Sequence, residues 1–393
     1  MDDMLTGISS DYLYFHGKKP KRVSDFHSPY FLAFAPQGRD INSSRADLLK
    51  KIEAEKSDSS PLSKIERIGE IENYSSFWDF DKTLKAFKVF TKKSYFVPEV
   101  SDHLFFYQNL YTGEHDIPYQ QRALADLAAS NKTWIYDSKG AKKNLNVLVY
   151  DIETTEFQKG SDNVPIDIIG YSNFDVKFES SKSLKTEEFS FDIIDLPQSW
   201  EEPEIVQLVS RNVDEEIDNL SDFCKIVMEN DIISGHNIIG FDNFQIYNRL
   251  NWIIKTYNER LKSDTRKVFQ EFLSKYSKPD KSFHFGTSSD SVQFYPANLD
   301  TYLGARKFYS FLNEFSLKAV APFLGVEIKD RLILTPDQIK IDDRTLKYNK
   351  HDVMEQLGVT LNLVQQALPL SFTTCLPFDM LLSSGAVYMW DHM

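Results

Sequence analysis

The sequence has little cysteine and no long apolar run. Its two cysteines, Cys224 and Cys375, lie far apart in the chain, which argues against a thiolate metal site and predicts a reducing compartment. No window reaches 18 uninterrupted apolar residues, and the first residues lack the basic and apolar regions of a signal peptide. We therefore expect a cytoplasmic protein without a membrane partner.

The chain also lacks an excess of positive charge. Its 45 Lys and Arg residues are outnumbered by 58 Asp and Glu residues, which gives a net charge of −13. Because phosphate contacts depend on Lys and Arg, this balance disfavours a protein whose whole surface binds nucleic acid. It leaves open a localised groove, or a site whose own carboxylates bind metal ions.

The length of 393 residues predicts two or three domains. Aromatic, strand-like stretches predict a β-rich N-terminal domain over residues 1–140. Residues 141–365 read as strands followed by interleaved helices, which predicts an α/β or α+β domain built on an open sheet. Residues 366–393 predict a helical segment that packs back on the N-terminal domain.

Two local expectations concern single elements. Ser44 is expected to begin a helix, with Asp47 at the third helical position of a capping box. The charged and polar stretch from Lys255 to Asp290 is expected to be an insertion or a hairpin on the surface of the second domain.

The apolar run Val147–Tyr150 predicts a buried strand, and two acids follow it. Side chains alternate along a strand, so Asp151 and Glu153 point to the same face. Two carboxylates at this spacing repel each other unless a cation lies between them, and a divalent metal ion is the usual one. The alternative is a solvated strand end.

Two later stretches add further acids. Asp242 follows a strand and a glycine-containing loop, at the point where a helix is expected to begin. Tyr348 and Asp352 are four residues apart on another predicted helix and therefore share a face. Taken singly, each acid could be a solvent-exposed surface residue, and Tyr348 could be a residue of the hydrophobic core. Four carboxylates on three elements, in this order and spacing, are instead typical of a site.

Four carboxylates suit two divalent ions. Mg²⁺ and Mn²⁺ prefer oxygen ligands, and two such ions about 4 Å apart promote in-line displacement at phosphorus. We therefore predict Asp151, Glu153, Asp242 and Asp352 as ligands of two Mg²⁺ or Mn²⁺ ions. Tyr348 would orient the attacking water through its phenol, which is protonated at neutral pH.

These stretches resemble the three motifs of the proofreading 3′–5′ exonuclease domain of family B DNA polymerases. Asp151–Glu153 resembles the first motif, Asn237–Asp242 the second, and Tyr348–Asp352 the third in its Tyr-x-x-x-Asp form. Phe315–Val320, between the last two, is also similar to the family. The resemblance implies a ribonuclease H-like fold with a mixed open sheet flanked by helices.

The resemblance also implies contacts with the terminal nucleotides of DNA. Thr154, Asn237 and Phe241 are the positions concerned, with Phe241 acting by stacking. Two alternatives stay open, because Asn237 could instead fix the loop that places Asp242, and Phe241 could seal a helix against the sheet.

The N-terminal part resembles the N-terminal domain of archaeal family B polymerases over residues 90–98 and 116–122. In some members this domain senses uracil in the template strand. Pro29, Val97 and Arg122 match the positions of that pocket, so the resemblance implies a uracil-sensing role for them.

The end of the chain resembles the helices that lead towards the polymerase palm, over residues 377–385, and no polymerase motif follows. We therefore expect the N-terminal and exonuclease portion of a DNA polymerase, either as a fragment or as one part of an enzyme encoded in pieces. The implied partners are a single-stranded 3′ end, the template strand, the polymerase half and a sliding clamp, and the implied location is the nucleoid. The alternatives are a DNA-binding, uracil-sensing module with little nuclease activity, and a stand-alone exonuclease.

Overall fold

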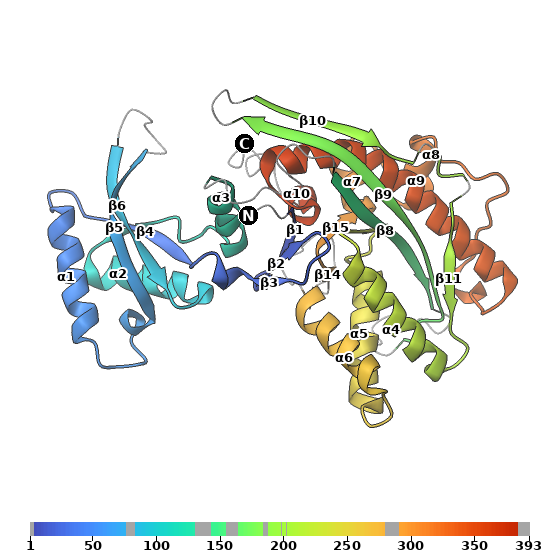
Figure 1. Ribbon diagram of the computed structural model, residues 1–393, viewed down its shortest axis with the longest axis horizontal. Helices are drawn as coiled ribbons and strands as arrows, with labels where there is room; N and C mark the ends of the chain where they lie inside the picture. Colours follow the sequence, from blue (N-terminus) through green and yellow to red (C-terminus); the bar gives the residue numbers. More distant parts are fainter. Residues whose placement is uncertain are drawn as a thin grey trace. The chain divides into compact units, whose positions relative to one another are not determined.

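Two stretches of the chain, residues 1–21 and 130–393, form one structural unit, and residues 22–129 form another (Figure 1). We call these the large unit and the small unit. The structure is a computed structural model. It describes a set of ranges between residues 4 and 383, namely 4–75, 83–129, 143–154, 164–183, 188–197, 199–201, 203–279 and 291–383.

This division differs from the expected one, because the first 21 residues belong with the later part of the chain. The ring of Tyr14 stacks on Tyr295 with centroids 5.1 Å apart, and His16 Nδ1 lies 2.7 Å from Asp231 Oδ2. A Cβ atom at Gly7 would lie 1.9 Å from the carbonyl oxygen of Pro296, so only glycine fits here. The N-terminal hairpin therefore completes the core of the large unit.

The large unit contains the N-terminal hairpin, a mixed sheet and the helices that flank the sheet. Its elements are β1 (Leu5–Ile8), β2 (Tyr12–Phe15), β8 (Lys143–Glu153), β9 (Ile168–Ser183), β10 (Glu188–Asp195), β11 (Val206–Val209), α4 (Val213–Glu229), β12 (Ile232–Gly235), α5 (Asp242–Tyr257), α6 (Ser263–Glu271), β13 (Ser277–Pro279), β14 (Val292–Phe294), β15 (Ala297–Asp300), α7 (Thr301–Phe308), α8 (Leu317–Phe323), α9 (Asp343–Thr374) and α10 (Phe378–Ser383).

The central sheet runs in the order β10-β9-β8-β12-β15, and β11 pairs with β9 beyond this path. β8 is antiparallel to β9 and parallel to β12, which in turn is parallel to β15. Helices cover both faces of β8, with α9 on one side and α4 and α5 on the other (Figure 1). This arrangement buries β8 on both faces, as its apolar sequence predicts.

Alternation along β8 divides its side chains between the two faces. Tyr150 points towards α4 and α5, where its ring lies 4.9 Å from that of Phe223 and its hydroxyl donates to Asn243 Oδ1. Asp151, one residue on, points towards α9, where it accepts hydrogen bonds from Asn349 and Gln356. The strand therefore delivers its acids to the face that α9 covers.

The small unit is an antiparallel sheet in the order β5-β6-β4-β7, with two helices packed on one face. The core on that face joins Phe31 and Phe87 of the sheet to Leu48 of the first helix and Leu104 of the second. Its elements are β4 (Tyr30–Phe34), α1 (Ile41–Ala54), β5 (Ile65–Ser75), β6 (Thr83–Thr91), α2 (Val97–Gln108), β7 (Tyr111–Gly113) and α3 (Tyr119–Ala129). The two-residue strand β3 (Lys21–Arg22) pairs with β2 where the chain passes between the units.

One local prediction is wrong, and the structure describes two other predicted stretches only in part. Helix α1 begins at Ile41 and not at Ser44, because Asp40 accepts the backbone N–H of Ser43 at 3.0 Å and caps the helix earlier. The stretch expected to be an insertion or a hairpin on the surface contains helix α6, which packs against α4, and β13, which pairs antiparallel with β14; residues 280–290 lie outside the described ranges. Of the segment after residue 366, the described residues up to 383 continue α9 and then form α10, which packs against α7, α9 and β15 within the large unit; residues 384–393 lie outside the described ranges.

None of the described helices combines the length and apolar character needed to cross a membrane.

A buried ion pair ties α4 to α5 beneath the sheet. The guanidinium of Arg249 donates to both carboxylate oxygens of Glu216, at 2.8 and 2.6 Å, and both side chains are at most 5% exposed. Glu216 also accepts the backbone N–H of Ile166 at 2.8 Å. Arg249 contacts both carboxylate oxygens of Glu216 and therefore compensates the charge of this buried side chain.

Replacing Arg249 with Met should lower the free energy of unfolding by about 3–5 kcal/mol, because Glu216 is then buried without a counter-charge. Urea unfolding of the large unit measures this change. Lys262→Met is the matched control, since it breaks an exposed pair with Asp218 and should cost less than about 1 kcal/mol. Equal losses in the two variants would contradict the expected role of burial.

Candidate functional site

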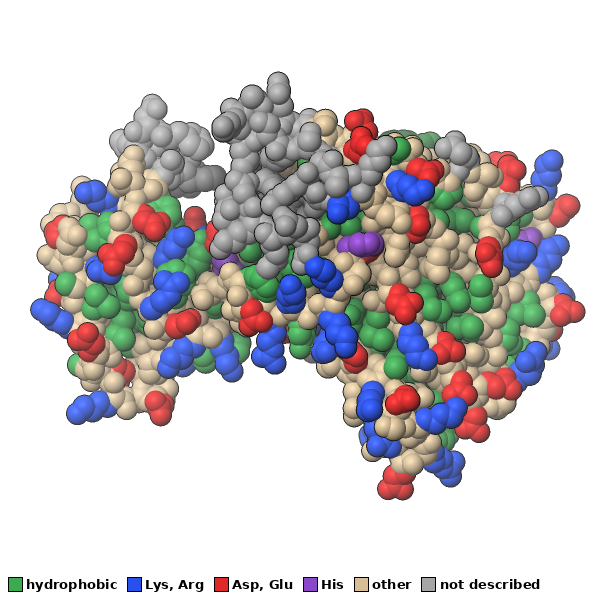
Figure 2. Space-filling view, viewed as in Figure 1, with side chains coloured by type: hydrophobic (Ala, Val, Ile, Leu, Met, Phe, Trp, Pro, Cys, Tyr) green, Lys and Arg blue, Asp and Glu red, His purple; other side chains and the backbone are tan. Residues whose placement is uncertain are grey.

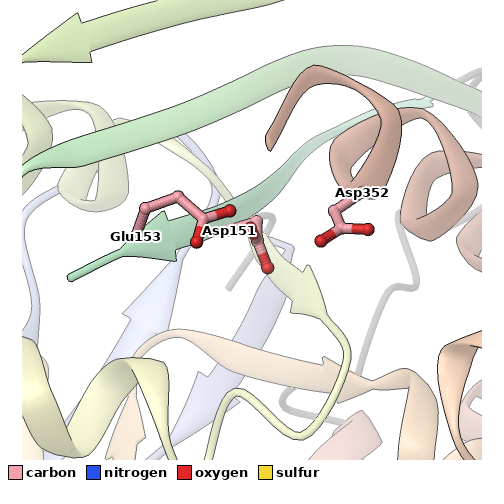
Figure 3. Close-up of side chains that lie close together, drawn as sticks. All are labelled: Asp151, Glu153 and Asp352. Carbon is pink, nitrogen blue, oxygen red and sulfur yellow. The ribbon is translucent and has the colours of Figure 1, made fainter. Parts of the chain in front are cut away.

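Three acids from two elements meet at the end of β8. Asp151 and Glu153 come from the strand and Asp352 from α9, and each can place one carboxylate oxygen within 4.8 Å of the others. Figure 3 shows Asp352 reaching from its helix towards the strand that carries the other two. This juxtaposition follows from the two periodicities, since residues two apart on a strand share a face and α9 lies along that face.

Asp242, the fourth predicted acid, lies beside this group but outside the 4.8 Å set. It is the first residue of α5 and is 4% exposed. Its Oδ1 accepts the backbone N–H of Ile152 at 3.2 Å, so it lies directly against the segment between the two strand acids. The structure thus brings all four predicted carboxylates to one end of β8, three of them in the closest contact.

Two amide side chains of α9 hold Asp151 in place. Gln356 Nε2 donates to Asp151 Oδ1 at 2.8 Å, and Asn349 Nδ2 donates to Asp151 Oδ2 at 3.1 Å. Gly170 pairs with Asp151 on the neighbouring strand, and a Cβ atom there would lie 2.0 Å from Asn349 Oδ1. Glycine is therefore required at this position for Asn349 to reach the acid.

Burial raises the pKa of every acid in the group. The pKa of Asp151 is raised well above its ordinary value by burial, and then by the negative charges of Glu153 and Asp352. Burial, followed by repulsion from the neighbouring acids, raises the pKa of Glu153 to about 9. Burial also raises the pKa of Asp242 to about 8. A bound cation would favour the ionised form of these carboxylates.

Burial raises the pKa of Asp352 less, to about 6, because Arg331 and Tyr348 oppose the effect. The guanidinium of Arg331 is ion-paired with Asp352 through Nη2 and with Glu355 through Nε. His351, adjacent to Asp352, accepts the backbone N–H of Leu332 at 3.2 Å and so helps to hold the segment that carries Arg331. One cation is therefore already present at the edge of the group.

The donor set suits a divalent metal ion. Glu153 Oε1 is buried and has no hydrogen-bond partner among the described residues, so one ligand atom is unused. An unsatisfied buried carboxylate oxygen is costly, and a bound cation satisfies it. All the candidate ligands are carboxylate oxygens, which Mg²⁺ and Mn²⁺ prefer. Asp151, Glu153, Asp242 and Asp352 could therefore hold such ions.

Tyr348 lies half-buried one helical turn before Asp352 and donates a hydrogen bond to its carboxylate. Burial, together with the charges of Asp352 and Glu153, raises the pKa of the phenol far above neutrality. The hydroxyl therefore keeps its proton, and its oxygen lone pairs can accept a hydrogen bond from a water molecule.

The three predicted DNA contacts have different exposures. Thr154 follows the strand acids and is buried, Phe241 is half-buried directly before Asp242, and Asn237 is exposed at the tip of its loop. Asn237 has a positive φ of 60°, and its carbonyl oxygen accepts the backbone N–H groups of Gly240 and Phe241. Its backbone shapes the loop while its side chain faces outwards, so both alternatives for Asn237 stay compatible with the structure.

The three residues of the predicted uracil pocket lie together in the small unit. Pro29, Val97 and Arg122 line one cavity of about 340 Å³, whose walls also include Tyr95 and Ile117. This cavity is made entirely from residues of the small unit.

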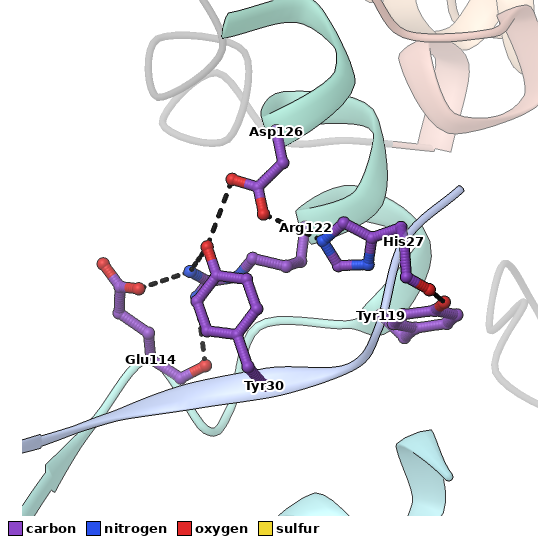
Figure 4. Close-up of polar contacts among 6 residues, drawn as sticks. All are labelled: His27, Tyr30, Glu114, Tyr119, Arg122 and Asp126. Atoms are coloured by element: carbon purple, nitrogen blue, oxygen red, sulfur yellow. Dashed lines mark hydrogen bonds and ion pairs between the residues drawn. The ribbon is translucent and has the colours of Figure 1, made fainter. Parts of the chain in front are cut away.

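The charge of Arg122 is already compensated within that unit (Figure 4). Arg122 is ion-paired with Glu114 and donates to the hydroxyl of Tyr30 at 3.3 Å. Tyr30 in turn donates to Asp126 at 3.1 Å, and His27 Nε2 lies 2.8 Å from the other oxygen of Asp126. The cavity therefore has a polar wall in which the charge of Arg122 is paired with that of Glu114.

Sequence reasoning missed the residues that support the acids. Asn349 and Gln356 lie three residues before and four residues after Asp352, so helical spacing places them on the same face and could have identified them. Arg331 gives no such signal, because it lies in a segment without regular structure and meets Asp352 only in the folded chain.

Comparisons with known proteins place this chain in a family. A family model described as "DNA polymerase family B, exonuclease domain" matches residues 121–320, which is 200 of the 393 residues. The match contains Asp151, Glu153 and Asp242, whereas Tyr348 and Asp352 lie beyond it. A search of curated proteins finds no match.

Among the solved structures, the chain is similar to the family B DNA polymerase from the hyperthermophilic archaeon Pyrobaculum calidifontis. The TM-score is 0.62 at 16% identity, and the alignment covers all of this chain and 49% of the polymerase. The expected fold, a mixed sheet flanked by helices with a β-rich N-terminal region, is thereby confirmed. Because the family model matches just over half of the sequence, the chain belongs to DNA polymerase family B and carries the exonuclease domain of that family.

Proposed function

We propose that the chain is a proofreading 3′–5′ exonuclease that hydrolyses the terminal phosphodiester of single-stranded DNA and releases a nucleoside monophosphate. The observation that carries the proposal is the meeting of Asp151, Glu153 and Asp352 within 4.8 Å, beside Asp242, with one Glu153 oxygen that has no hydrogen-bond partner among the described residues. Because the chain spans about half the length of its structural neighbour, partnership with a polymerase half and a sliding clamp is part of the same proposal.

The four acids would hold two Mg²⁺ or Mn²⁺ ions. When bound, such a pair supplies charge stabilisation to an in-line displacement at phosphorus. Tyr348 donates a hydrogen bond to Asp352, so its oxygen would accept a hydrogen bond from a water molecule and turn the water's lone pair towards the phosphorus. Gln356 and Asn349 fix the orientation of the Asp151 carboxylate by donating to both of its oxygens. The carboxylate therefore needs less reorientation when substrate binds.

The charge distribution on the surface suggests that DNA binding depends more on contacts at the site than on general electrostatic attraction to DNA. On the face in Figure 2, described Lys and Arg side chains are interspersed with Asp and Glu side chains and do not gather into one patch. Together with the net charge of −13, this distribution favours weak metal-independent binding. The exposed Asn237 and the half-buried Phe241 would then contact the terminal nucleotides.

Asp151→Asn should lower the rate of hydrolysis more than about 100-fold, because losing only the hydrogen-bond partners of a metal ligand costs about 10–100-fold. Digestion of a 3′-labelled single strand with Mg²⁺ or Mn²⁺ measures the rate, and EDTA should abolish it in the parent. Asp175→Asn is the control, since it makes the same change at an exposed acid on β9. If the Asp151 variant digests the strand as fast as the parent, the proposed site is wrong.

The thermal stability of the metal-free protein should fall as the pH rises from about 5 to about 8. The pKa of Glu153 is about 9 in the folded state, above its ordinary value, so folding is favoured below the ordinary pKa and this advantage is lost as the pH rises towards 9. Asp242, with a pKa of about 8, acts in the same direction. Mn²⁺ should restore the melting temperature, and more strongly at the higher pH.

Glu153→Gln tests the cause of this slope, because the amide does not titrate. Melting curves in EDTA should show a shallower fall in melting temperature with pH for this variant than for the parent. An unchanged slope would mean that the buried acids do not set the pH dependence.

A second candidate function is uracil sensing by the small unit, supported by the single cavity that Pro29, Val97 and Arg122 line. Uracil differs from thymine by one methyl group, and rejection of one such group by a fitted pocket is worth roughly tenfold or more in affinity. The internal pairing of Arg122 with Glu114 favours a neutral base over an anion.

Fluorescence anisotropy in EDTA, with single strands that contain uracil or thymine, tests this function. We expect the uracil strand to bind more tightly, and Ile117→Trp, which fills the cavity from a side chain that is 40% exposed, to remove the difference. Leu84→Trp, at an exposed position outside the cavity, is the control. Equal affinities for the two strands in the parent would exclude the second function without affecting the first.

A further inference from the structure

An acid outside the three motifs lies beneath the loop that carries two of the predicted site residues. Asp300 ends β15, which pairs in parallel with β12 so that Asp300 stands opposite Gly235. The two strands therefore end at the same edge of the sheet, where β12 continues into the loop of residues 236–241. Asp300 is 1% exposed, so its carboxylate depends on protein groups for all its hydrogen bonds.

The carboxylate of Asp300 accepts four backbone hydrogen bonds. Two come from its own helix α7, from Tyr302 at 2.9 Å and Leu303 at 3.3 Å, and form an ordinary N-cap. The other two come from the loop, from Asn237 to Oδ1 at 3.1 Å and from Ile239 to Oδ2 at 3.2 Å. One oxygen thus caps the helix and holds Asn237, while the other is used by the loop alone.

Capping explains only half of these bonds. Asn212 caps α4 with the same pattern, accepting the N–H groups of the second and third residues after it, and does so with one amide oxygen. A Ser, Asn or Thr residue could likewise cap α7. A second acceptor oxygen is needed only for the loop.

The loop that Asp300 holds leads directly to Asp242. Asn237 has a positive φ, and its carbonyl oxygen accepts from Gly240 and Phe241, which closes the turn. The N–H of Asn243 bonds to the carbonyl of Ile238 at 2.8 Å, so the turn continues into the start of α5. A shift of this turn would therefore move Asp242 away from the backbone of Ile152.

We propose that Asp300 is a positioning residue of the exonuclease site, whose carboxylate fixes the 236–241 loop so that Asp242 faces the other acids. The inference rests on the proposed function, since it assigns a role toward the metal ligands. Asp300 acts through the loop backbone and touches neither DNA nor a metal ion.

Asp300→Ser separates the two tasks of this side chain. Serine caps a helix well, but it offers a single, shorter acceptor in place of a carboxylate that spans both helix and loop. We expect the variant to keep α7 and to bind Mn²⁺ about 10–100-fold more weakly, because partners that orient metal ligands contribute on this scale. Titration of Mn²⁺ followed by electron paramagnetic resonance measures the affinity directly, and digestion of a single strand provides a second readout.

Asn212→Ser is the matched control, because it makes the same kind of cap change on α4, whose cap bonds no loop of the site. It should leave Mn²⁺ affinity unchanged, and both variants should melt within a few degrees of each other. Unchanged Mn²⁺ affinity in folded Asp300→Ser would overturn the inference. Failure of the parent itself to bind Mn²⁺ would instead overturn the proposed function.

If Asp300→Ser does not fold, Asp300→Asn is measured by the same criteria. The amide keeps the size of the side chain and one acceptor oxygen, but it turns an NH₂ group towards one of the backbone N–H donors. Weaker Mn²⁺ binding in this folded variant supports the inference, and parental affinity overturns it.

Discussion

Mutual repulsion among buried carboxylates is the constraint on which this structure depends. Asp151, Glu153 and Asp352 come within 4.8 Å of one another, and burial and repulsion raise the pKa values of both strand acids, that of Glu153 to about 9. Without a cation, the folded state must hold these groups protonated or tolerate their charge. The same repulsion that lowers the local stability of the metal-free site therefore increases its affinity for cations, as is typical of functional sites.

The rest of the large unit supplies the rigidity that such a site requires. Gln356 joins two of the motif stretches, because its amide donates to Asp151 and its oxygen accepts the backbone N–H of His236. Arg331 holds Asp352 from outside, and Asp300 holds the loop before Asp242 from below. Each contact joins elements that are distant in sequence, so the geometry of the acids depends on the complete unit.

The acids and the elements that carry them could be predicted from sequence, because strand and helix periodicities are local properties. Asp151 and Glu153 share a face for that reason, as do Tyr348 and Asp352. Arg331 and Asp300 could not be found in this way, since the site residues that they hold, Asp352 and Asn237, are 21 or more residues away. The start of α1 was predicted wrongly for a different reason: Asp40 and Ser44 are both competent caps, and only the tertiary fold selects Asp40.

The large unit is built from two separate stretches of the chain, and this has a consequence for synthesis of the protein on the ribosome. The small unit is complete once residue 129 has been made, whereas Tyr14 must wait for Tyr295, about 280 residues later. At about 5–20 residues per second, this delay lasts roughly 15–55 s. During that interval the apolar hairpin of β1 and β2, which is buried in the finished protein, is exposed to solvent and to chaperones. Completion of the large unit is thus a late event, because the N-terminal strand pair packs against residues that are made long after it.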